Sequence, residues 1–327
     1  MSYRVGINGF GRIGKIVFKI LRERGIEVPL VNDPFLDTSY MYYLLKYDTV
    51  YGTDCKVEMK NNKLIYYGKE TELSTAKCPS EIQWKKYNVD YVIECTGVFK
   101  TIKDCELHKE VKSVIISAPS DDAPMFVYGV NHEKYNGEKI ISNASCTTNC
   151  LAPLANIINN HFGIEEGLMT TVHSATATQK IVDGITKKYK RDGRSGMQNI
   201  IPASTGAAKS VGKVIPELNQ KLNGMAMRVP ILDVSVVDLT VRLRESTSLE
   251  NIKSVLCEES KKMPNIIGVT EDDVVSSDFI KDPRSCIFDF KASMEMGDKF
   301  FKLIAWYDNE YGYASRIADL VDYVSKK

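Results

Sequence analysis

The chain has 327 residues, of which 43% are hydrophobic, so it is long enough to fold as two domains that each bury a core. Its 43 Lys and Arg residues nearly balance 42 Asp and Glu residues, and the net charge of +1 excludes an overall field that would draw the protein to nucleic acid or to a membrane surface. The eight cysteines show no C-x-x-C pair and no zinc-like spacing, so we expect reduced thiols and no metal site.

The start of the sequence carries no targeting signal that we can identify. Its first residues, MSYRVGINGFGRIG, lead straight into a strand-like run and lack the charged and apolar regions of a secretory leader. No apolar run in the sequence approaches the length of a membrane span. We therefore expect a cytoplasmic protein that does not contact a membrane.

A glycine-rich turn follows the first predicted strand. Residues 3–7 (YRVGI) are typical of a short strand, residues 9–14 read GFGRIG, and a helical pattern of apolar residues follows. Glycines allow the close backbone approach that a dinucleotide pyrophosphate needs, and the helix N-terminus would face the phosphates. The next predicted strand ends at Asp33, at about the 20-residue spacing expected for an acid that accepts ribose hydroxyls and repels a 2′-phosphate. The pattern favours NAD over NADP, although a glycine turn followed by an exposed acid would read the same way.

Further apolar runs indicate a parallel sheet. Runs that begin at Tyr91, Ser113 and Lys139 each end in small or polar residues and are separated by helix-like or loop segments. In an open α/β sheet, ligands bind beyond the carboxyl ends of the strands. The residues expected to line a cofactor site at these ends are Thr96, Gly97, Ser117 and Ala118.

The pattern changes after Cys150. Longer β-rich stretches, GLMTTVHSATATQ, VSVVDLTVRLR and FFKLIAWYDNEYGY, predict a second domain built on a mixed or antiparallel sheet. The final residues, SRIADLVDYVSKK, have the apolar spacing of a helix. Because the sequence has no internal repeat and no Pro-rich linker, we expect two closely packed domains.

The stretch SNASCTTNC, from Ser142 to Cys150, places Cys146 at a predicted junction of strand and helix. Amide N–H groups and the helix dipole at such a junction favour thiolate over thiol, which would make Cys146 a nucleophile near neutral pH. Its small and hydroxyl-bearing neighbours leave space for an anionic ligand. By itself the pattern also fits a buried structural thiol, which is our interpretation of Cys150.

A basic segment, Lys187 to Arg194, lies later in the chain and reads KKYKRDGR. It is either a solvated surface loop or part of an interface or a phosphate site. Further along, Ser204, Thr205 and Gly206 are typical of a small anion-binding turn ahead of a helix.

Five longer strings identify a family. NGFGRIG, SNASCTTNCLAPLA, MTTVHSATATQK, NIIPASTGAAK and WYDNEYGY occur in one order along almost the whole chain. Together they resemble phosphorylating, NAD-dependent glyceraldehyde-3-phosphate dehydrogenase. The resemblance implies a Rossmann-type parallel-sheet NAD domain, residues 1–146 with a C-terminal helix at 312–327. It also implies an α+β catalytic domain with a mostly antiparallel or mixed sheet, residues 147–311.

The resemblance also implies a role for each site residue. Cys146 would be the nucleophile and His173 its general base, although a lone histidine after a β-rich run is more often a core residue. Thr176 and Arg228 would bind the C3 phosphate of the substrate. The residues implied for the attacking inorganic phosphate are Ser145, Thr147, Thr205 and Gly206. The residues expected to bind NAD, from the patterns above or from the resemblance, are Asn8, Gly9, Gly11, Arg12, Ile13, Asp33, Thr96, Ser117, Asn309 and Tyr313.

The implied reaction belongs to glycolysis. Cys146 adds to the aldehyde of D-glyceraldehyde 3-phosphate, hydride passes to NAD, and phosphate releases 1,3-bisphosphoglycerate from the resulting thioester. The resemblance further implies a homotetramer. Three departures from the family pattern bear on assembly and on one neighbouring contact: Ile185 stands where proline is common, Lys190 where an aromatic residue is, and Cys95 where serine is.

Two alternatives stay open on the sequence alone. A related phosphorylated aldehyde, such as erythrose 4-phosphate, would share the same chemistry. A binding or redox-sensing protein would instead use the dinucleotide groove for RNA, or Cys146 as a peroxide target. RNA binding has no support beyond the one basic segment.

Overall fold

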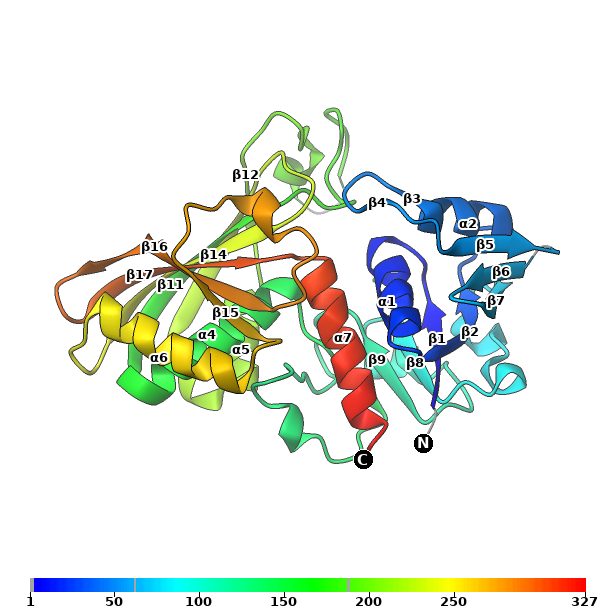
Figure 1. The fold of residues 1–327 in the computed structure, drawn as a ribbon, viewed down its shortest axis with the longest axis horizontal. Helices are drawn as coiled ribbons and strands as arrows, with labels where there is room; N and C mark the ends of the chain where they lie inside the picture. The colour runs from blue at the N-terminus through cyan, green and yellow to red at the C-terminus, as the bar shows by residue number, and fades with distance from the viewer. Residues whose placement is uncertain (1–2, 62, 187–188) are drawn as a thin grey trace. The chain divides into compact units, whose positions relative to one another are not determined.

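The computed structural model describes residues 3–61, 63–186 and 189–327, and the chain divides into two compact units (Figure 1). The first unit comprises Met1–Phe126, His132–Ser145 and Ala314–Lys327. The second unit comprises Val127–Asn131 and Cys146–Tyr313. Each unit is built on a large sheet of its own.

The first unit contains an eight-stranded sheet in the order β10-β9-β8-β1-β2-β7-β6-β5. Neighbours from β10 to β7 pair in parallel, and the β7-β6-β5 edge is antiparallel. This largely parallel arrangement confirms the predicted Rossmann-type class. The strand bounds are β1 Arg4–Asn8, β2 Glu27–Asn32, β5 Val57–Lys60, β6 Lys63–Tyr66, β7 Lys69–Ser74, β8 Tyr91–Glu94, β9 Ser113–Ile116 and β10 Ile140–Ser142, with a separate pair, β3 Tyr47–Asp48 and β4 Gly52–Thr53.

The helices α1 (Arg12–Glu23), α2 (Thr38–Lys46) and α3 (Ile102–Cys105) lie in the first unit, and most of α7 (Tyr311–Val324) belongs to it as well. Strands β8 and β9 are buried along their whole length, as expected for central strands of a parallel sheet. Helix α7 is tied to the N-terminal part of the unit, because Asp319 pairs with Arg24 at 2.6 Å. The helix predicted from the last residues is therefore confirmed.

The second unit contains a seven-stranded sheet in the order β12-β13-β11-β14-β17-β16-β15. The pairs β11-β13 and β15-β16 are parallel and the others antiparallel, so the predicted mixed sheet is confirmed. The strand bounds are β11 Ile164–His173, β12 Ile201–Ser204, β13 Leu222–Arg228, β14 Ser235–Leu243, β15 Ile267–Thr270, β16 Cys286–Met296 and β17 Phe300–Tyr307.

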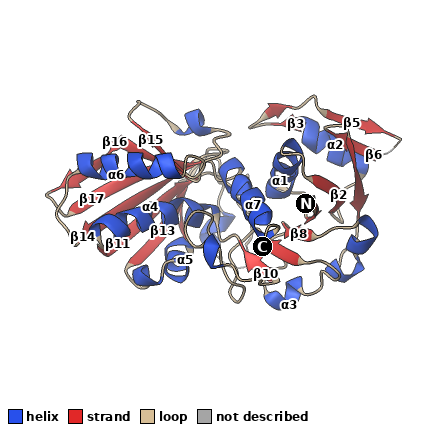
Figure 2. Ribbon diagram, turned by 60° about the horizontal axis from the view of Figure 1, so that its bottom comes forward, coloured by secondary structure: helices blue, strands red, loops and turns tan. Residues whose placement is uncertain are grey.

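Helices α4 (Cys146–Phe162), α5 (Ala207–Val214) and α6 (Leu249–Lys262) pack against the sheet of the second unit (Figure 2). Side chains along β14 and β17 alternate between buried and partly exposed, with the period of two that a sheet covered on one face requires. The helices therefore provide the apolar layer against which one face of the sheet is buried.

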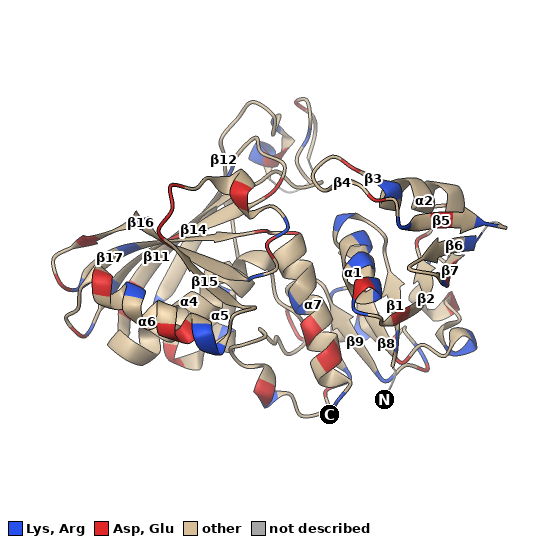
Figure 3. Cartoon of the chain, in the orientation of Figure 1, with Lys and Arg blue, Asp and Glu red and all other residues tan. Residues whose placement is uncertain are grey.

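Acidic and basic residues are interspersed along α6 (Figure 3). Lys261 pairs with Glu258 at 2.6 Å, and Lys262 pairs with Glu259 at 2.8 Å. This mixture agrees with the balanced charge of the sequence. In the described part of the chain, no helix is both long enough and apolar enough to cross a membrane.

Candidate active site

A strained turn places Cys146 at the start of a helix. Strand β10 ends at Ser142 and α4 begins at Cys146. Between them, Ala144 has a φ of 56°, a left-handed conformation that costs an L-residue about 1 kcal/mol. The Ser142 hydroxyl accepts from the Ala144 amide at 3.0 Å and donates to the Ala118 carbonyl at 2.6 Å, which holds the turn in place. The junction of strand and helix expected for Cys146 is thus present.

The structure brings Cys146 and His173 together within the second unit. His173 is the last residue of β11, and its Nε2 lies 3.5 Å from the Cys146 sulfur. The imidazole is buried, and the Tyr307 ring packs against it edge-on with 6.1 Å between ring centroids. This geometry allows a proton to pass between the thiol and the imidazole.

Burial governs the titration of the thiol. Desolvation raises the pKa of Cys146, and it outweighs the opposing effects of the Arg228 charge and of the hydrogen bonds at the start of α4. We expected the helix amides to favour the thiolate; they act in that direction, but the burial of the thiol is the larger effect. The thiol form is therefore favoured, and the nucleophile needs a base.

His173 is suited to act as that base. Burial, followed by the positive charge of Arg228, lowers the pKa of His173 to about 3, and the Ser174 carbonyl offsets this only in part. The imidazole is therefore neutral at physiological pH, and one of its nitrogens carries a lone pair that can accept the thiol proton.

Arg228 shares the other nitrogen of the imidazole with a carbonyl. Strands β11 and β13 pair in parallel with His173 opposite Arg228. Arg228 Nη1 lies 2.5 Å from His173 Nδ1, and the Ser174 carbonyl lies 2.8 Å from the same nitrogen. Nδ1 cannot accept from Arg228 and donate to Ser174 at once. When Nδ1 donates to Ser174, Nε2 presents its lone pair to Cys146, so a ligand that draws the guanidinium away from Nδ1 favours the base form.

Tyr307 is a residue of the site that the sequence analysis did not single out. Its hydroxyl lies 2.9 Å from both the Thr147 and the Thr171 hydroxyls. Thr147, expected to bind phosphate, is buried here and directed toward Tyr307. The only sequence signal for Tyr307 was its position in the WYDNEYGY string, which gives no indication that it packs against His173.

Asn309 is held in one orientation. Its side-chain oxygen accepts from the Ser174 hydroxyl at 2.9 Å and from the Ser235 hydroxyl at 2.7 Å. The amide NH₂ is therefore the group that can donate to a ligand. Tyr313, also expected near the cofactor, is buried in the first turns of α7.

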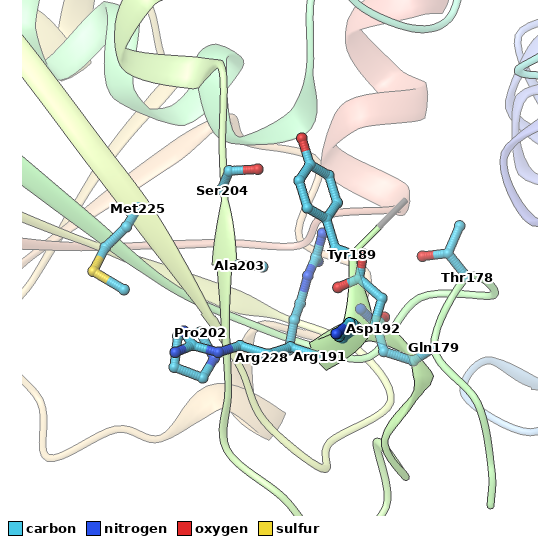
Figure 4. Close-up of a pocket in the computed structure, with 11 residues that line it drawn as sticks. Thr178, Gln179, Tyr189, Arg191, Asp192, Pro202, Ala203, Ser204, Met225 and Arg228 are labelled. Carbon is cyan, nitrogen blue, oxygen red and sulfur yellow. The ribbon is translucent and has the colours of Figure 1, made fainter. Parts of the chain in front are cut away.

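A cavity of about 590 Å³ in the second unit, lined mostly by polar and charged residues, lies beside Arg228 (Figure 4). No carboxylate of the described residues forms an ion pair with this guanidinium, so its charge is available to an anion. The cavity is lined by Thr178, Gln179, Tyr189, Lys190, Arg191, Asp192, Pro202, Ala203, Ser204, Met225 and Arg228.

Three other expected phosphate ligands, Thr176, Thr205 and Gly206, lie within two residues in sequence of the lining residues Thr178 and Ser204. Thr176 Oγ1 donates to the Gln179 side chain at 2.8 Å. Thr205 Oγ1 accepts from the Ala207 amide at 3.2 Å, directly before α5, and Gly206 is the N-cap of that helix. Thr205 and Gly206 therefore occupy a helix N-terminus, where amide groups favour an anion.

The predicted basic segment is described only in part, because Lys187 and Lys188 lie outside the described residues. Its remainder forms a 3-10 turn, Lys190–Gly193. Arg194 then pairs with Asp183 at 2.7 Å on the surface, where such pairs stabilise a protein little.

The glycine turn of the first unit fits a dinucleotide. Gly9 has a φ of +92°, and a Cβ there would lie 2.7 Å from the Thr96 amide nitrogen. A Cβ on Gly11 would meet no described atom within 4 Å, and Gly11, the N-cap of α1, has no side chain to cap the helix. The amides of this turn, including those of Arg12 and Ile13, are thus placed where a pyrophosphate would find donors and room.

Asp33 fixes the turn that follows the next strand. Its carboxylate accepts from the Phe10 amide at 2.9 Å and from the Phe35 amide at 3.0 Å. A carboxylate has further lone pairs that ribose hydroxyls can use. The Arg12 side chain, in contrast, pairs with Asp48 at 2.5 Å.

Two comparisons with known proteins bear on this site. Residues 3–102 match the family model "Glyceraldehyde 3-phosphate dehydrogenase, NAD binding domain", and residues 145–309 match "Glyceraldehyde 3-phosphate dehydrogenase, C-terminal domain". Glyceraldehyde-3-phosphate dehydrogenase 1 of Schizosaccharomyces pombe is 56% identical over 330 residues, covering 99% of this chain and 98% of that protein. A cytosolic glyceraldehyde-3-phosphate dehydrogenase of Mesembryanthemum crystallinum is 55% identical over 334 residues, again covering 99% and 98%. Glyceraldehyde-3-phosphate dehydrogenase 2 of Danio rerio is 56% identical over 329 residues, with the same coverage.

Proposed function

Because this chain belongs to the glyceraldehyde-3-phosphate dehydrogenase family, we propose that Cys146 and His173 carry out its reaction. The chain is an NAD-dependent glycolytic oxidoreductase that converts D-glyceraldehyde 3-phosphate, phosphate and NAD to 1,3-bisphosphoglycerate and NADH. The observation that carries the assignment of roles is the 3.5 Å approach of His173 Nε2 to the Cys146 sulfur. Residues 1–146 with 312–327 form the NAD-binding domain in this proposal, and residues 147–311 form the catalytic domain.

In the first half of the reaction, His173 Nε2 takes the thiol proton as the Cys146 sulfur forms a bond to the aldehyde carbon. His173 then holds the proton of the thiohemiacetal hydroxyl, and the Cys146 amide donates to the developing oxyanion. Bound NAD supplies a hydride acceptor for the carbon. The product on the protein is a thioester of Cys146.

The second half transfers the acyl group to phosphate. An oxygen of inorganic phosphate adds to the thioester carbon, the C–S bond breaks, and the Cys146 thiolate leaves with the acyl phosphate as product. His173 returns a proton to the sulfur. The thioester retains the free energy of the oxidation that hydrolysis would lose, so exclusion of water from the site is required.

Two anion subsites follow from the same proposal. We assign the C3 phosphate of the substrate to Thr176 and Arg228, since Arg228 lines a cavity whose residues are mostly polar or charged. An anion on Arg228 would also withdraw the guanidinium from His173 Nδ1 and so favour the base form of the imidazole. We assign inorganic phosphate to Ser145, Thr147, Thr205 and Gly206; Thr147 must then exchange its contact with Tyr307 for the ligand.

The cofactor contacts are assigned by the same reasoning. The amide NH₂ of Asn309 would donate to the nicotinamide carboxamide, with Tyr313 near the ring. Asp33 would accept the ribose hydroxyls. The remaining NAD contacts are assigned to Asn8, Gly9, Gly11, Arg12, Ile13, Thr96 and Ser117.

The reaction is tested by its dependence on phosphate. Purified protein with NAD and glyceraldehyde 3-phosphate is expected to form NADH over many turnovers only when inorganic phosphate is added. Without phosphate, a burst of about one NADH per site should be followed by a slow phase, because the thioester accumulates. Equal steady rates with and without phosphate would instead indicate a hydrolytic aldehyde dehydrogenase. Parallel assays with erythrose 4-phosphate show which aldehyde is preferred.

We further propose that the protein is a cytoplasmic homotetramer. The location is supported by the word "cytosolic" in the name of the plant relative. Assembly is supported by apolar side chains that are exposed along the segment before β12, and exposed patches of this kind mark interfaces. These side chains are Ile181, Val182, Ile185, Met197 and Ile200.

The assembly surface is tested at Ile185, whose side chain is 95% exposed. Ile185→Asp is expected to shift the protein from tetramer toward smaller species in light scattering, because a charge would be buried at the interface. Val275→Asp, at another exposed apolar residue, serves as the matched control. A parent protein that scatters as a monomer would refute the tetramer, and an Ile185→Asp tetramer as stable as the control would remove this residue from the interface.

A further inference from the structure

A buried polar network in the first unit takes no part in the reaction steps above. Its centre is Glu94, the last residue of β8, whose side chain has 0% exposed surface. Two donors lie on Oε2, Asn8 Nδ2 at 2.6 Å and His108 Nε2 at 3.0 Å. Two more lie on Oε1, the Thr96 amide at 2.8 Å and the Thr96 hydroxyl. A carboxylate buried this completely is tolerated only with such a set of partners.

The tautomer of His108 follows from its second contact. The indole N–H of Trp84 lies 3.1 Å from His108 Nδ1, and an indole nitrogen can only donate. Nδ1 is therefore the acceptor, and Nε2 carries the proton that faces Glu94. His108 has 0% exposed surface, so solvent does not compete for either nitrogen. Trp84 thus fixes the tautomer of His108, and His108 in turn donates to the Glu94 carboxylate.

The network continues through Asn8 to a third strand. Asn8, the last residue of β1, uses its NH₂ on Glu94, and its side-chain oxygen accepts from Asn32 Nδ2 at 2.8 Å. Asn32, the last residue of β2, accepts from the Ala76 amide at 2.9 Å. Each of the two amide side chains donates on the side toward Glu94 and accepts on the other side. The Glu94 carboxylate therefore fixes the orientation of the Asn8 and Asn32 amide groups.

Each end of this network lies next to a segment assigned to NAD. Gly9 follows Asn8, Asp33 follows Asn32, and Thr96 is itself a member. The Gly9 and Thr96 backbones are packed so tightly that a Cβ on Gly9 would lie 2.7 Å from the Thr96 nitrogen. A displacement of Glu94 would therefore move the glycine turn and the Thr96 segment relative to each other.

We propose that Glu94, supported by His108, is a positioning residue for NAD: it holds the ends of β1, β2 and β8 in the register that the dinucleotide requires. This inference rests on the proposed NAD-dependent activity and deepens it, because neither side chain is assigned a contact with cofactor or substrate. Glu94 acts by fixing Asn8 and Thr96, and both of these residues are assigned contacts with NAD.

The test is the affinity for NAD in Glu94→Gln, measured by isothermal titration calorimetry with NAD alone. The substitution keeps the shape of the side chain but turns one acceptor oxygen into a donor, which then faces another donor of the network. The dissociation constant for NAD is expected to rise about tenfold. In steady-state assays KM for NAD should rise, while KM for glyceraldehyde 3-phosphate stays unchanged.

Thr71→Val is the matched control for a purely structural effect. Thr71 is buried in β7 of the same sheet, and its hydroxyl donates to the Val28 carbonyl at 2.8 Å. This variant also loses one buried hydrogen bond, so its Tm should fall while its NAD affinity stays within about twofold of the parent. A Glu94→Gln chain that binds NAD as tightly as Thr71→Val overturns the inference. A parent chain that binds no NAD overturns the proposed function itself.

A second pair of variants decides the matter if Glu94→Gln does not fold. His108→Ala removes the donor to Glu94, and His108→Gln places a side-chain NH₂ close to the position of Nε2. Weakened NAD binding in His108→Ala that is restored in His108→Gln supports the inference. Equal NAD affinity in these two variants and the parent overturns it.

Discussion

Replacing Cys146 with serine is expected to lower kcat for NADH formation by about 10³-fold or more. A serine hydroxyl is a far weaker nucleophile than a thiol, and its ester does not have the reactivity of the thioester toward phosphate. The side chain is nearly isosteric, and NAD contacts have been assigned to other residues. NAD affinity and Tm should therefore stay close to those of the parent, which separates loss of chemistry from loss of structure.

Cys150→Ala is the matched control for this experiment. Cys150 lies one turn further along α4, is fully buried and has no place in the proposed mechanism. Its loss should reduce stability through a small cavity while leaving kcat within a few-fold. Peptide mapping after alkylation of the native parent should locate the reactive thiol at Cys146. A Cys146→Ser enzyme that keeps more than about a tenth of the parent kcat would assign the nucleophile elsewhere.

The sequence was sufficient for the parts of the fold that depend on local pattern. The strand, glycine turn and helix at residues 4–23 follow from spacing alone, because a close backbone approach requires Gly9 and the apolar period defines α1. The junction at Cys146 and the closing helix α7 follow for the same reason. The antiparallel β5-β6-β7 edge was missed, because these short strands bury few side chains and so give only a weak apolar pattern. The buried residues are Val57, Leu64, Tyr66 and Thr71.

The arrangement of the site depends on contacts that no local pattern contains. His173 and Arg228 meet because β11 and β13 pair in one particular register, and the intervening chain gives no indication of that register. The depth of burial that raises the pKa of Cys146 is likewise a property of the folded unit. Glu94 and His108 were not singled out, because a lone acid at a strand end and a lone histidine each read as ordinary residues until the fold brings them within 3.0 Å.

Replacing His173 with asparagine is expected to lower kcat by about 10² to 10⁴-fold, the usual effect of removing a general base. Asparagine keeps a polar group beside Cys146 but cannot take a proton from the thiol or from the thiohemiacetal hydroxyl. His161→Asn is the matched control, since His161 is partly exposed, pairs with Glu259 at 3.5 Å and has no place in the proposed mechanism. The rate of NADH formation in the first turnover should fall by as much as the steady-state rate, because the proton must be removed before hydride transfer in every turnover.

The pH dependence of thiol alkylation tests the same pair in a second way. Burial and the Arg228 charge lower the pKa of His173 to about 3, so at pH values well above 3 the imidazole is neutral in the parent. Burial raises the pKa of Cys146, so the rate of its alkylation by iodoacetamide should climb with rising pH and reach half its maximum above the usual value of a thiol. The His173→Asn variant should keep this rise of the alkylation rate at alkaline pH (the alkaline limb). Its midpoint is set by the desolvation of the thiol and not by the imidazole. At neutral pH, below this limb, the neutral imidazole can take the thiol proton as the sulfur is alkylated, so the parent should be alkylated faster than His173→Asn. Equal rates in the two proteins at neutral pH would contradict the role of His173 as the base.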